Sequence, residues 1–167
     1  MNEQTDRTTR ETPKRLIIVS NRLPVVFERK NSLLTFRSGS GGLVTALAPV
    51  LRDRGGMWIG WSGLPESEQE EVTTVLKDSS VASGYELAAV PLSETDLELY
   101  YHGFSNEIIW PLFHDLQSHC HFVPEYWHAY QRVNRSFAER VFHETHSMDY
   151  IWVHDYCLLY TSPSPRD

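Results

Sequence analysis

The sequence predicts an α/β fold in which a doubly wound parallel sheet is covered by helices. Short apolar segments rich in β-branched residues alternate with longer segments of helical periodicity, which is the pattern of strands joined by crossover helices. The first apolar segment, Leu16–Val19, is unbroken, as expected for a strand buried on both faces of a parallel sheet. Glycines at 39, 41 and 42 precede a helical segment, and glycine-rich connections from strand to helix are common in this fold class.

The composition is that of an ordinary globular protein and excludes several functional classes. The net charge is −7 and the basic residues form no stripe, which argues against a nucleic-acid partner. Two cysteines, Cys120 and Cys157, cannot form a disulfide framework, and the lack of a signal peptide fits a cytoplasmic protein. The sequence contains no run of about 18 apolar residues that would predict a membrane span, so no membrane partner is expected. Several of the five Trp and eight Tyr adjoin Gly or Pro, which indicates a site for a flat or polyhydroxylated ligand.

The first part of the chain predicts two strands, a hairpin and a helix. The first strand ends in the polar residues 20–22, which mark its carboxyl end. Residues 23–37 alternate apolar and polar side chains and predict a hairpin or an excursion loop. Apolar residues recur at helical spacing over Gly42–Arg54, and Gly55-Gly56 is expected to end this helix. Met57–Trp61 is the second predicted strand.

The middle of the chain has a weaker pattern. Pro65–Lys77 is acidic and weakly helical, and residues 79–84 predict a loop. Tyr85–Leu92 predicts a third strand. Ser93 has the spacing of a capping box, so a helix is expected from Ser93 to about Tyr101, with Gly103 interrupting it.

The last third of the chain predicts a long helix and one more strand. Phe104–Trp110 predicts a short helical turn that Pro111 closes. Pro124–Thr145 is the longest predicted helix, with apolar residues along one face. Tyr150–Val153 predicts the next strand, which ends in the polar residues His154-Asp155-Tyr156.

The two ends of the chain depart from this alternation. Residues 1–14 are polar and lack periodicity, which predicts a disordered tail. Residues 160–167 contain two Ser-Pro steps where a helix is due, and Ser-Pro steps disfavour a helix. We therefore expect a partial domain over residues 15–159 and a tail foreign to the fold after it. Such a domain would leave the strand at Tyr150–Val153 as an exposed edge.

Arg22, Gly41 and Gly42 are the first candidate binding residues. Arg22 follows a strand at the edge of the sheet that faces the ligand crevice in this fold class, where a guanidinium can bind a phosphate or a carboxylate. The two glycines open a helix and let its backbone N–H groups approach an anion. Two simpler explanations stay open: Arg22 could be a surface ion-pair partner, and the glycines could only form a tight turn.

Asp155 is a further candidate, because it follows the last predicted strand. A carboxylate there can accept hydrogen bonds from sugar hydroxyls or act as a base, and it can equally cap the next helix. His114, His119 and His121 invite a metal site, but their spacing matches no established zinc pattern. We therefore predict no metal.

Five stretches, taken in order, resemble the trehalose-6-phosphate synthases, which are retaining glucosyltransferases of GT-B fold. The stretches are VSNRLP at Val19–Pro24, SGGL at Ser40–Leu43, GGMWIGWSG at Gly55–Gly63, YYHGFSNEIIWPLFH at Tyr100–His114, and VNRSFAERV followed by DYIWVHDYCLL up to Leu159. No single stretch identifies the family, whereas the ordered set over residues 15–159 is highly specific.

The resemblance implies that glucose moves from UDP-glucose to the 1-hydroxyl of glucose 6-phosphate, giving trehalose 6-phosphate and UDP. The anomeric configuration is retained, no cofactor or metal takes part, and a full-length enzyme could be a homo-oligomer. Residue by residue, the resemblance implies an acceptor-phosphate contact at Arg22 and a donor contact at Gly41 and Gly42. The other implied site residues are the acceptor-side aromatics Tyr101, Trp110 and Trp58, and the sugar-binding, catalytic Asp155.

The chain departs from the family pattern in two ways. Cys157 stands where the family usually has His, which we expect to be a mild change. Family members also continue after Leu159 with the rest of the acceptor domain and a second domain, whose basic residues grip the UDP diphosphate. The resemblance therefore implies a truncated, Rossmann-like N-terminal domain of a GT-B glycosyltransferase. Because a GT-B active site lies between two domains, the resemblance also implies that the chain is inactive by itself.

Two other functions stay open at this point. One is a sibling transferase that uses another phosphorylated polyol, such as glycerol 3-phosphate. The other is a non-catalytic domain that senses sugar phosphate or serves as a regulatory subunit. Arg22, Tyr101 and Trp110 favour an acceptor the size of a hexose phosphate, although a sensor could keep the same pocket.

Overall fold

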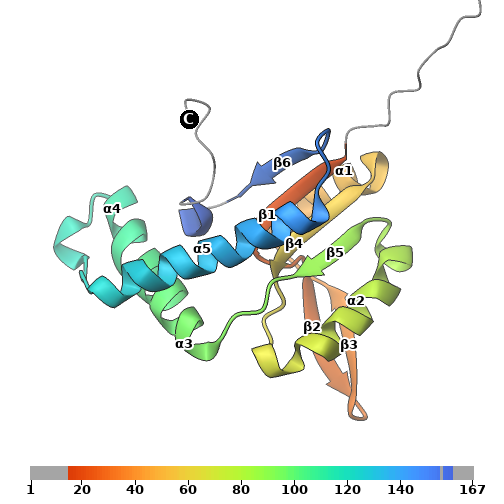
Figure 1. Cartoon of the computed structure of the whole chain (residues 1–167), viewed down its shortest axis with the longest axis horizontal. Helices are drawn as coiled ribbons and strands as arrows, with labels where there is room; N and C mark the ends of the chain where they lie inside the picture. The colour runs from red at the N-terminus through yellow and green to blue at the C-terminus, as the bar shows by residue number, and fades with distance from the viewer. Residues whose placement is uncertain (1–14, 155, 160–167) are drawn as a thin grey trace, which may run out of the picture.

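The computed structural model describes residues 15–154 and 156–159, without the side chains of residues 78–82. Its main sheet has four parallel strands in the order β5-β4-β1-β6, and Figure 1 shows the helices packed around it. The bounds are Leu16–Arg22 for β1, Gly56–Trp61 for β4, Glu86–Ala89 for β5 and Tyr150–Val153 for β6. The four strands predicted from the sequence are confirmed. The predicted tails at 1–14 and 160–167 lie outside the described residues.

The hairpin predicted after the first strand is also present. It consists of β2 (Val25–Lys30) and β3 (Leu33–Ser38), which pair in antiparallel fashion as a separate two-stranded sheet. The turn at Asn31 and Ser32 has positive φ at both residues, which suits a two-residue hairpin connection. This hairpin lies between β1 and the first helix and ends beside the glycine-rich loop.

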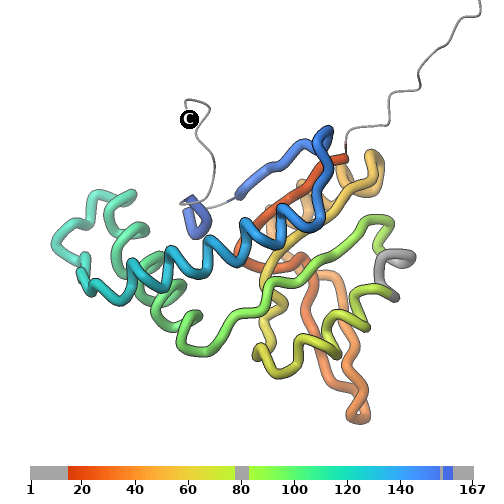
Figure 2. The backbone as a smooth tube through the Cα atoms, viewed as in Figure 1, coloured from red at the N-terminus to blue at the C-terminus, as the bar shows by residue number. Residues whose placement is uncertain are grey.

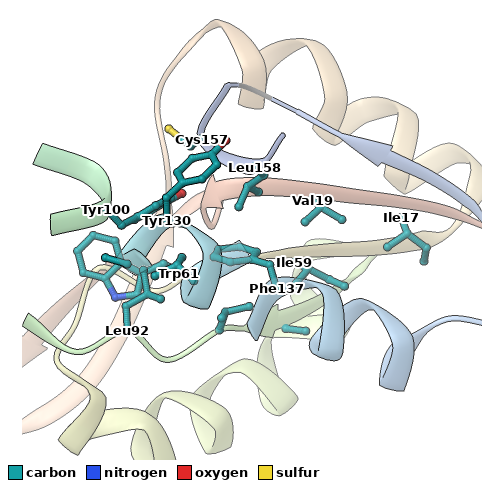
Figure 3. Packing of buried hydrophobic residues seen from close by; sticks show 14 of the residues in the cluster. Ile17, Val19, Ile59, Trp61, Leu92, Tyr100, Tyr130, Phe137, Cys157 and Leu158 are labelled. Carbon is teal, nitrogen blue, oxygen red and sulfur yellow. The ribbon is translucent and has the colours of Figure 1, made fainter. Parts of the chain in front are cut away.

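The inner strands β1 and β4 are buried on both faces and their alternate residues belong to two different cores, whereas the residues of the edge strand β6 are exposed. Ile17 and Val19 of β1 pack with α5 (Pro124–Glu144), where Figure 3 shows side chains gathered between helix and sheet. Ile18 and Trp58 face the opposite way and pack with other helices. Each fully buried apolar side chain of this kind stabilises the fold by about 1.5–3 kcal/mol. The central position of β1 therefore explains its unbroken apolar sequence.

Two helices cover the second face of the sheet. They are α1 (Gly42–Arg54) and α2 (Gln69–Ser83), preceded by the short 3₁₀ turn η1 (Glu66–Glu68). The loop predicted at residues 79–84 is wrong, because α2 continues to Ser83. Gly84, with φ of 76°, ends the helix in the left-handed region that glycine adopts without strain. Contacts between α2 and β5 outweigh the weak helix propensity of the Asp and Ser residues at this end.

A continuous helical segment, which the sequence predicts as two pieces, packs against α5. Ser93 caps it as predicted, since its Oγ accepts a hydrogen bond from the Asp96 N–H at 3.0 Å. The segment then runs through α3 (Glu94–Asp96), the π-helix η2 (Leu97–Ile109) and α4 (Trp110–Phe113). The break predicted at Gly103 is wrong, as is the separate turn at 104–110 closed by Pro111.

Gly103 is explained by packing rather than by a break in the helix. A Cβ at this position would lie 2.7 Å from the ring of Tyr126 on α5. Glycine is therefore needed where η2 and α5 approach each other closely. Pro111 does not end the segment, since α4 continues past it to Phe113.

The chain returns to the sheet after α5. Figure 2 shows the tube running from α5 into β6 alongside β1. Before α5, the chain forms the 3₁₀ turn η3 (Gln117–His119). Another 3₁₀ turn, η4 (Tyr156–Leu158), follows β6. Within the described part of the chain, no helix combines the length and the apolar character needed to cross a bilayer.

A partly buried ion pair joins the start of β1 to the turn before β6. The Arg15 guanidinium donates to both carboxylate oxygens of Asp149, from Nε at 3.1 Å and from Nη2 at 2.7 Å. Nη2 also donates to the Glu144 carbonyl at the end of α5. The Asp149 side chain is only 5% exposed, and its hydrogen bonds from Arg15 lower its pKa from 3.8 to about 2. The ion pair thus holds β6 in register beside β1.

We expect Asp149→Asn to lower the free energy of unfolding by about 2 kcal/mol at pH 7, because the folded state loses the group whose pKa it depresses. This contribution is present above the unfolded pKa of 3.8 and is lost as the pH falls towards 2. Urea unfolding from pH 7 to pH 2 measures it. The control Asp53→Asn changes an exposed carboxylate and should have little effect. A difference between wild type and Asp149→Asn that stays constant down to pH 2 would contradict this assignment.

Candidate functional site

A cavity of about 520 Å³ opens at the carboxyl end of the sheet. It is lined by the end of β1, the hairpin, the glycine-rich loop before α1, part of η2 and the residues on either side of position 155. Five of the seven residues predicted from the sequence line it: Arg22, Gly41, Gly42, Trp58 and Tyr101. The fold therefore brings together residues that are up to 79 positions apart in the sequence.

Arg22 is an exposed cation at the wall of this cavity. Within the described residues, no carboxylate pairs with its guanidinium and no hydrogen bond to it is formed. Arg15, Arg29 and Arg37 by contrast each pair with at least one carboxylate. The guanidinium carbon of Arg22 instead lies 4.6 Å from the ring centroid of Trp61. Arg22 is therefore available to bind an anion, and the alternative of a surface ion pair does not apply among the described residues.

The backbone at Arg22 is fixed by a buried relay of hydrogen bonds. Trp58 Nε1 donates to Ser20 Oγ at 2.8 Å, and Ser20 Oγ donates to the Arg22 carbonyl at 2.7 Å. Trp58 is fully buried, so it supports the wall of the cavity from behind rather than presenting an open ring. Sequence reasoning missed Ser20, although a small polar residue between a buried strand and an arginine was a usable signal.

Gly60 on β4 gives the chain room to turn after β1. A Cβ at Gly60 would lie 2.6 Å from the Arg22 carbonyl carbon and 2.7 Å from the Leu23 nitrogen. The Leu23 N–H in turn donates to the Trp61 carbonyl at 2.9 Å. The position of Arg22 thus depends on the missing side chain of Gly60.

The glycine-rich loop lies on another side of the cavity and leads into α1. Gly41 has φ of 149°, and its carbonyl accepts the Thr45 N–H at 3.0 Å. No side chain caps the start of α1, and its first turn contains no acidic residue. A Cβ at Gly42 would meet no atom within 4 Å. The backbone conformation explains Gly41, whereas no protein atom near Gly42 requires glycine at that position.

The two predicted acceptor-side aromatics are placed differently. Tyr101 of η2 lines the cavity. Trp110 is not among the lining residues; it is 42% exposed and stacks on His114, with ring centroids 4.1 Å apart. The structure therefore brings Tyr101, but not Trp110, to the cavity wall.

Asp155 lies outside the described residues, while its neighbours His154 and Tyr156 line the cavity. Two buried polar side chains of α5 hold the chain just after this position. Tyr130 Oη donates to the Tyr156 carbonyl at 2.8 Å and accepts the Leu159 N–H at 3.0 Å. Asn134 Nδ2 donates to the Cys157 carbonyl at 3.2 Å. Sequence reasoning missed Tyr130 and Asn134 as residues that shape the site, although a polar Asn on an apolar helix face was a signal.

The other groups considered from the sequence do not form a second site. Among the described residues, no group of three or more His, Cys, Asp and Glu side chains is arranged to hold a metal ion. Cys120 is partly buried and Cys157 is buried, and they form no disulfide with each other. A smaller cavity of about 270 Å³ lies near β5, α2 and α5, away from the residues predicted to bind a ligand.

The geometry of the main cavity suits a polar, anionic ligand. The Arg22 guanidinium, which no described carboxylate pairs with, and the uncapped start of α1 both attract negative charge, and they lie on the same cavity. Tyr101 and the neighbouring backbone add groups that can bind hydroxyls. The arrangement can therefore hold a phosphorylated sugar, or two ligands of which each carries phosphate.

Comparison with known proteins gives one family. The sequence model of glycosyltransferase family 20 matches residues 14–164. Trehalose-6-phosphate synthase from Mycolicibacterium smegmatis is 41% identical over 143 residues, which cover 85% of this chain and 27% of that protein. The UDP-forming alpha,alpha-trehalose-phosphate synthase from Candida albicans is 40% identical over 148 residues, covering 87% of this chain and 30% of that protein. The resemblance found in the motifs is thus confirmed.

Solved structures agree with the sequence matches. A UDP-forming alpha,alpha-trehalose-phosphate synthase from Burkholderia xenovorans in complex with glucose 6-phosphate has a TM-score of 0.61 and 30% identity, covering 86% of this chain and 28% of that chain. A structure described as trehalose-6-phosphate from E. coli bound with UDP-2-fluoro glucose has a TM-score of 0.65 and 31% identity. The match covers 87% of this chain and 28% of that chain. The predicted Rossmann-like GT-B fold is confirmed, and the chain spans less than a third of the length of these relatives.

We expect Gly60→Ala to destabilise the protein by about 1–3 kcal/mol, because its Cβ would overlap the backbone of Arg22 and Leu23. Gly42→Ala is the matched control, since a Cβ there meets open space and Ala is favoured in a helix. Denaturant unfolding of both variants tests the claim. Equal stability of the two variants would show that the turn after β1 does not depend on Gly60.

Proposed function

This chain belongs to glycosyltransferase family 20, and from that premise we propose that it forms the acceptor side of a retaining glucosyltransferase site. The proposed reaction moves glucose from UDP-glucose to glucose 6-phosphate and releases trehalose 6-phosphate and UDP. Relatives that are about 40% identical are synthases of this product, and one solved relative is a complex with glucose 6-phosphate. Because the chain spans less than a third of their length, the remaining parts of such an enzyme would complete the site.

The observation that carries the proposal is the Arg22 guanidinium at the cavity wall, which has no carboxylate partner among the described residues. A phosphate offers oxygens that match the fork of N–H donors on a guanidinium, and such charge-assisted hydrogen bonds are short and strong. We assign Arg22 to the acceptor phosphate. The cavity of about 520 Å³ is large enough for a hexose phosphate.

The start of α1 is assigned to the donor. Backbone N–H groups at Gly41 and Gly42 would face the diphosphate and sugar of UDP-glucose, and the dipole of α1 favours negative charge there. No Cβ blocks the approach at Gly42. A ligand phosphate would therefore meet backbone donors rather than side chains on this side of the cavity.

The remaining roles complete the proposal. Tyr101 at the cavity wall would contact the acceptor sugar, and Trp58 would support that wall. For Trp110 and Asp155 the family resemblance is the support, with Trp110 on the acceptor and Asp155 on the sugar hydroxyls.

The proposed mechanism needs neither a metal nor a covalent glucosyl-enzyme. The acceptor 1-hydroxyl would attack from the face that UDP leaves, so the configuration is retained, and basic residues elsewhere in the enzyme would stabilise the charge on UDP. No cofactor takes part, and the partners are the two small-molecule substrates. We place this chemistry in the cytoplasm, a compartment that suits a chain whose two cysteines do not pair with each other.

Arg22→Ala is expected to weaken binding of glucose 6-phosphate to the 167-residue chain by about 10- to 100-fold, because one charge-assisted pair with the phosphate is lost. Binding of glucose, which carries no phosphate, should change little. Titration followed by NMR measures both ligands. The control Arg29→Ala removes an arginine that pairs with Glu68 and Glu71 away from the cavity.

Two outcomes of this titration would redirect the proposal. Unchanged affinity for glucose 6-phosphate in Arg22→Ala would remove the acceptor assignment. Tighter binding of glycerol 3-phosphate than of glucose 6-phosphate to the wild type would favour a sibling transferase.

Gly42→Val is expected to abolish measurable UDP-glucose binding while leaving the fold intact. The branched side chain would occupy the space in front of the α1 N-terminus, where no protein atom lies within 4 Å of the Cβ. Calorimetric titration with UDP-glucose and thermal unfolding measure the two effects. Unchanged donor affinity together with an unchanged unfolding temperature would refute the donor assignment.

A further inference from the structure

The stretch Gly60-Trp61-Ser62-Gly63 contacts Arg22 but has no role in the proposed reaction so far. Arg22 and Trp61 are neighbours in the pairing of β1 with β4, after a shift in register between Val19 and Arg22. The guanidinium carbon of Arg22 lies 4.6 Å from the ring centroid of Trp61, within the range of a cation–π contact. Among the described residues, this is the only contact of the Arg22 guanidinium with an aromatic ring.

The Trp61 ring is a fixed surface. Trp61 is 5% exposed and belongs to the core between the sheet and α5, and Figure 3 places it with Leu92 at one end of that core. Its Nε1 donates to the Leu64 carbonyl at 3.1 Å, while the Leu64 N–H donates to Ser62 Oγ at 3.1 Å. The ring therefore cannot turn without breaking the tight turn that follows β4.

Gly63 leaves space for the guanidinium on this surface. Its φ is 88°, and a Cβ at Gly63 would lie 3.4 Å from Arg22 Nη1. Any larger side chain would extend towards the same atoms and displace them. The turn at 61–64 thus offers a flat ring beside a position without a side chain.

The contact with Trp61 occupies the flat face of the Arg22 guanidinium and not its N–H donors. A guanidinium that stacks on a ring uses its flat face, whereas its N–H bonds point outward in its own plane. No described carboxylate or carbonyl accepts from these N–H groups. A long side chain that is already held on a ring loses less conformational freedom when a phosphate binds than a side chain that moves freely.

We propose that Trp61 and Gly63 form a positioning element that holds the Arg22 guanidinium ready for the acceptor phosphate. Trp61 and Gly63 do not touch the ligand; they act through Arg22. The inference rests on the proposed function, because it assigns the group that Arg22 binds. Its effect is confined to the phosphate-dependent part of the affinity.

The experiment compares Trp61→Phe and Trp61→Leu in the 167-residue chain. NMR titrations with glucose 6-phosphate and with glucose give the ratio of the two affinities. Loss of the ring in Trp61→Leu should lower this ratio about two- to five-fold, the size of an exposed cation–π contact. Trp61→Phe keeps an aromatic face and should restore part of the ratio. Thermal unfolding reports how far each variant remains folded.

A double-mutant cycle separates positioning from a purely structural role. In the Arg22→Ala background, Trp61→Leu should no longer change the ratio of affinities, because the side chain through which Trp61 acts is gone. An equal loss in both backgrounds would overturn the inference. So would tighter binding of glucose 6-phosphate to Trp61→Leu, which would mean that the stacked arginine has to leave the ring.

Gly63→Ala gives an independent test that leaves the core intact. Its control is Gly84→Ala, since Gly84 also has positive φ, 76°, and its Cβ would lie 3.4 Å from the side chain of Arg52, away from the cavity. Both variants should lose similar stability, but only Gly63→Ala should lower the ratio of affinities. Equal ratios in the two variants would overturn the role of Gly63.

The results distinguish this inference from the proposed function. If Arg22→Ala leaves the affinity for glucose 6-phosphate unchanged, the acceptor assignment itself fails. If Arg22→Ala weakens binding but the Trp61 and Gly63 variants do not, Arg22 binds the phosphate without help from this turn. If Trp61→Leu does not fold, Trp61→Phe and Gly63→Ala decide the question.

Discussion

The close contact between the end of β1 and Gly60 is the constraint on which the site depends. The peptide between Arg22 and Leu23 lies where a side chain at residue 60 would otherwise be, so β1 can leave the sheet directly over β4. The Leu23 N–H then binds the Trp61 carbonyl, and Ser20 binds the Arg22 carbonyl from the other side. These contacts set where the hairpin begins and where the Arg22 side chain leaves the backbone.

The same arrangement explains how two anion-binding features come to share one cavity. The hairpin of β2 and β3 carries the chain away from β1 and returns it to the glycine-rich loop, whose Gly39 N–H binds the Pro24 carbonyl at 2.7 Å. The start of α1 is thereby brought back to the end of β1. The positive charge of Arg22 and the uncapped N-terminus of α1 therefore act on the same volume.

The π-helix η2 and the long helix α5 shape the remaining walls through buried polar contacts. Tyr100 Oη of η2 binds Asn21 Oδ1 at 3.1 Å, next to Arg22, while Tyr101 beside it lines the cavity. Tyr130 and Asn134 of α5 bind backbone groups of residues 156–159 on the far side. A buried polar group without a partner costs free energy, so each of these pairs fixes one geometry of the wall.

The sequence by itself determined the alternation of strands and helices, the hairpin, and the candidates Arg22, Gly41 and Gly42, because buried strands, helix starts and turns have local composition. The ordered motifs likewise determined the family. Local rules wrongly predicted a helix break at Gly103 and a loop at residues 79–84. The packing of η2 on α5 outweighs the glycine, and the packing of α2 on β5 outweighs the polar residues at the end of α2. Only the tertiary structure could show that Arg22 has no carboxylate partner among the described residues and stacks on Trp61, since the two residues meet through strand pairing across 39 positions of sequence.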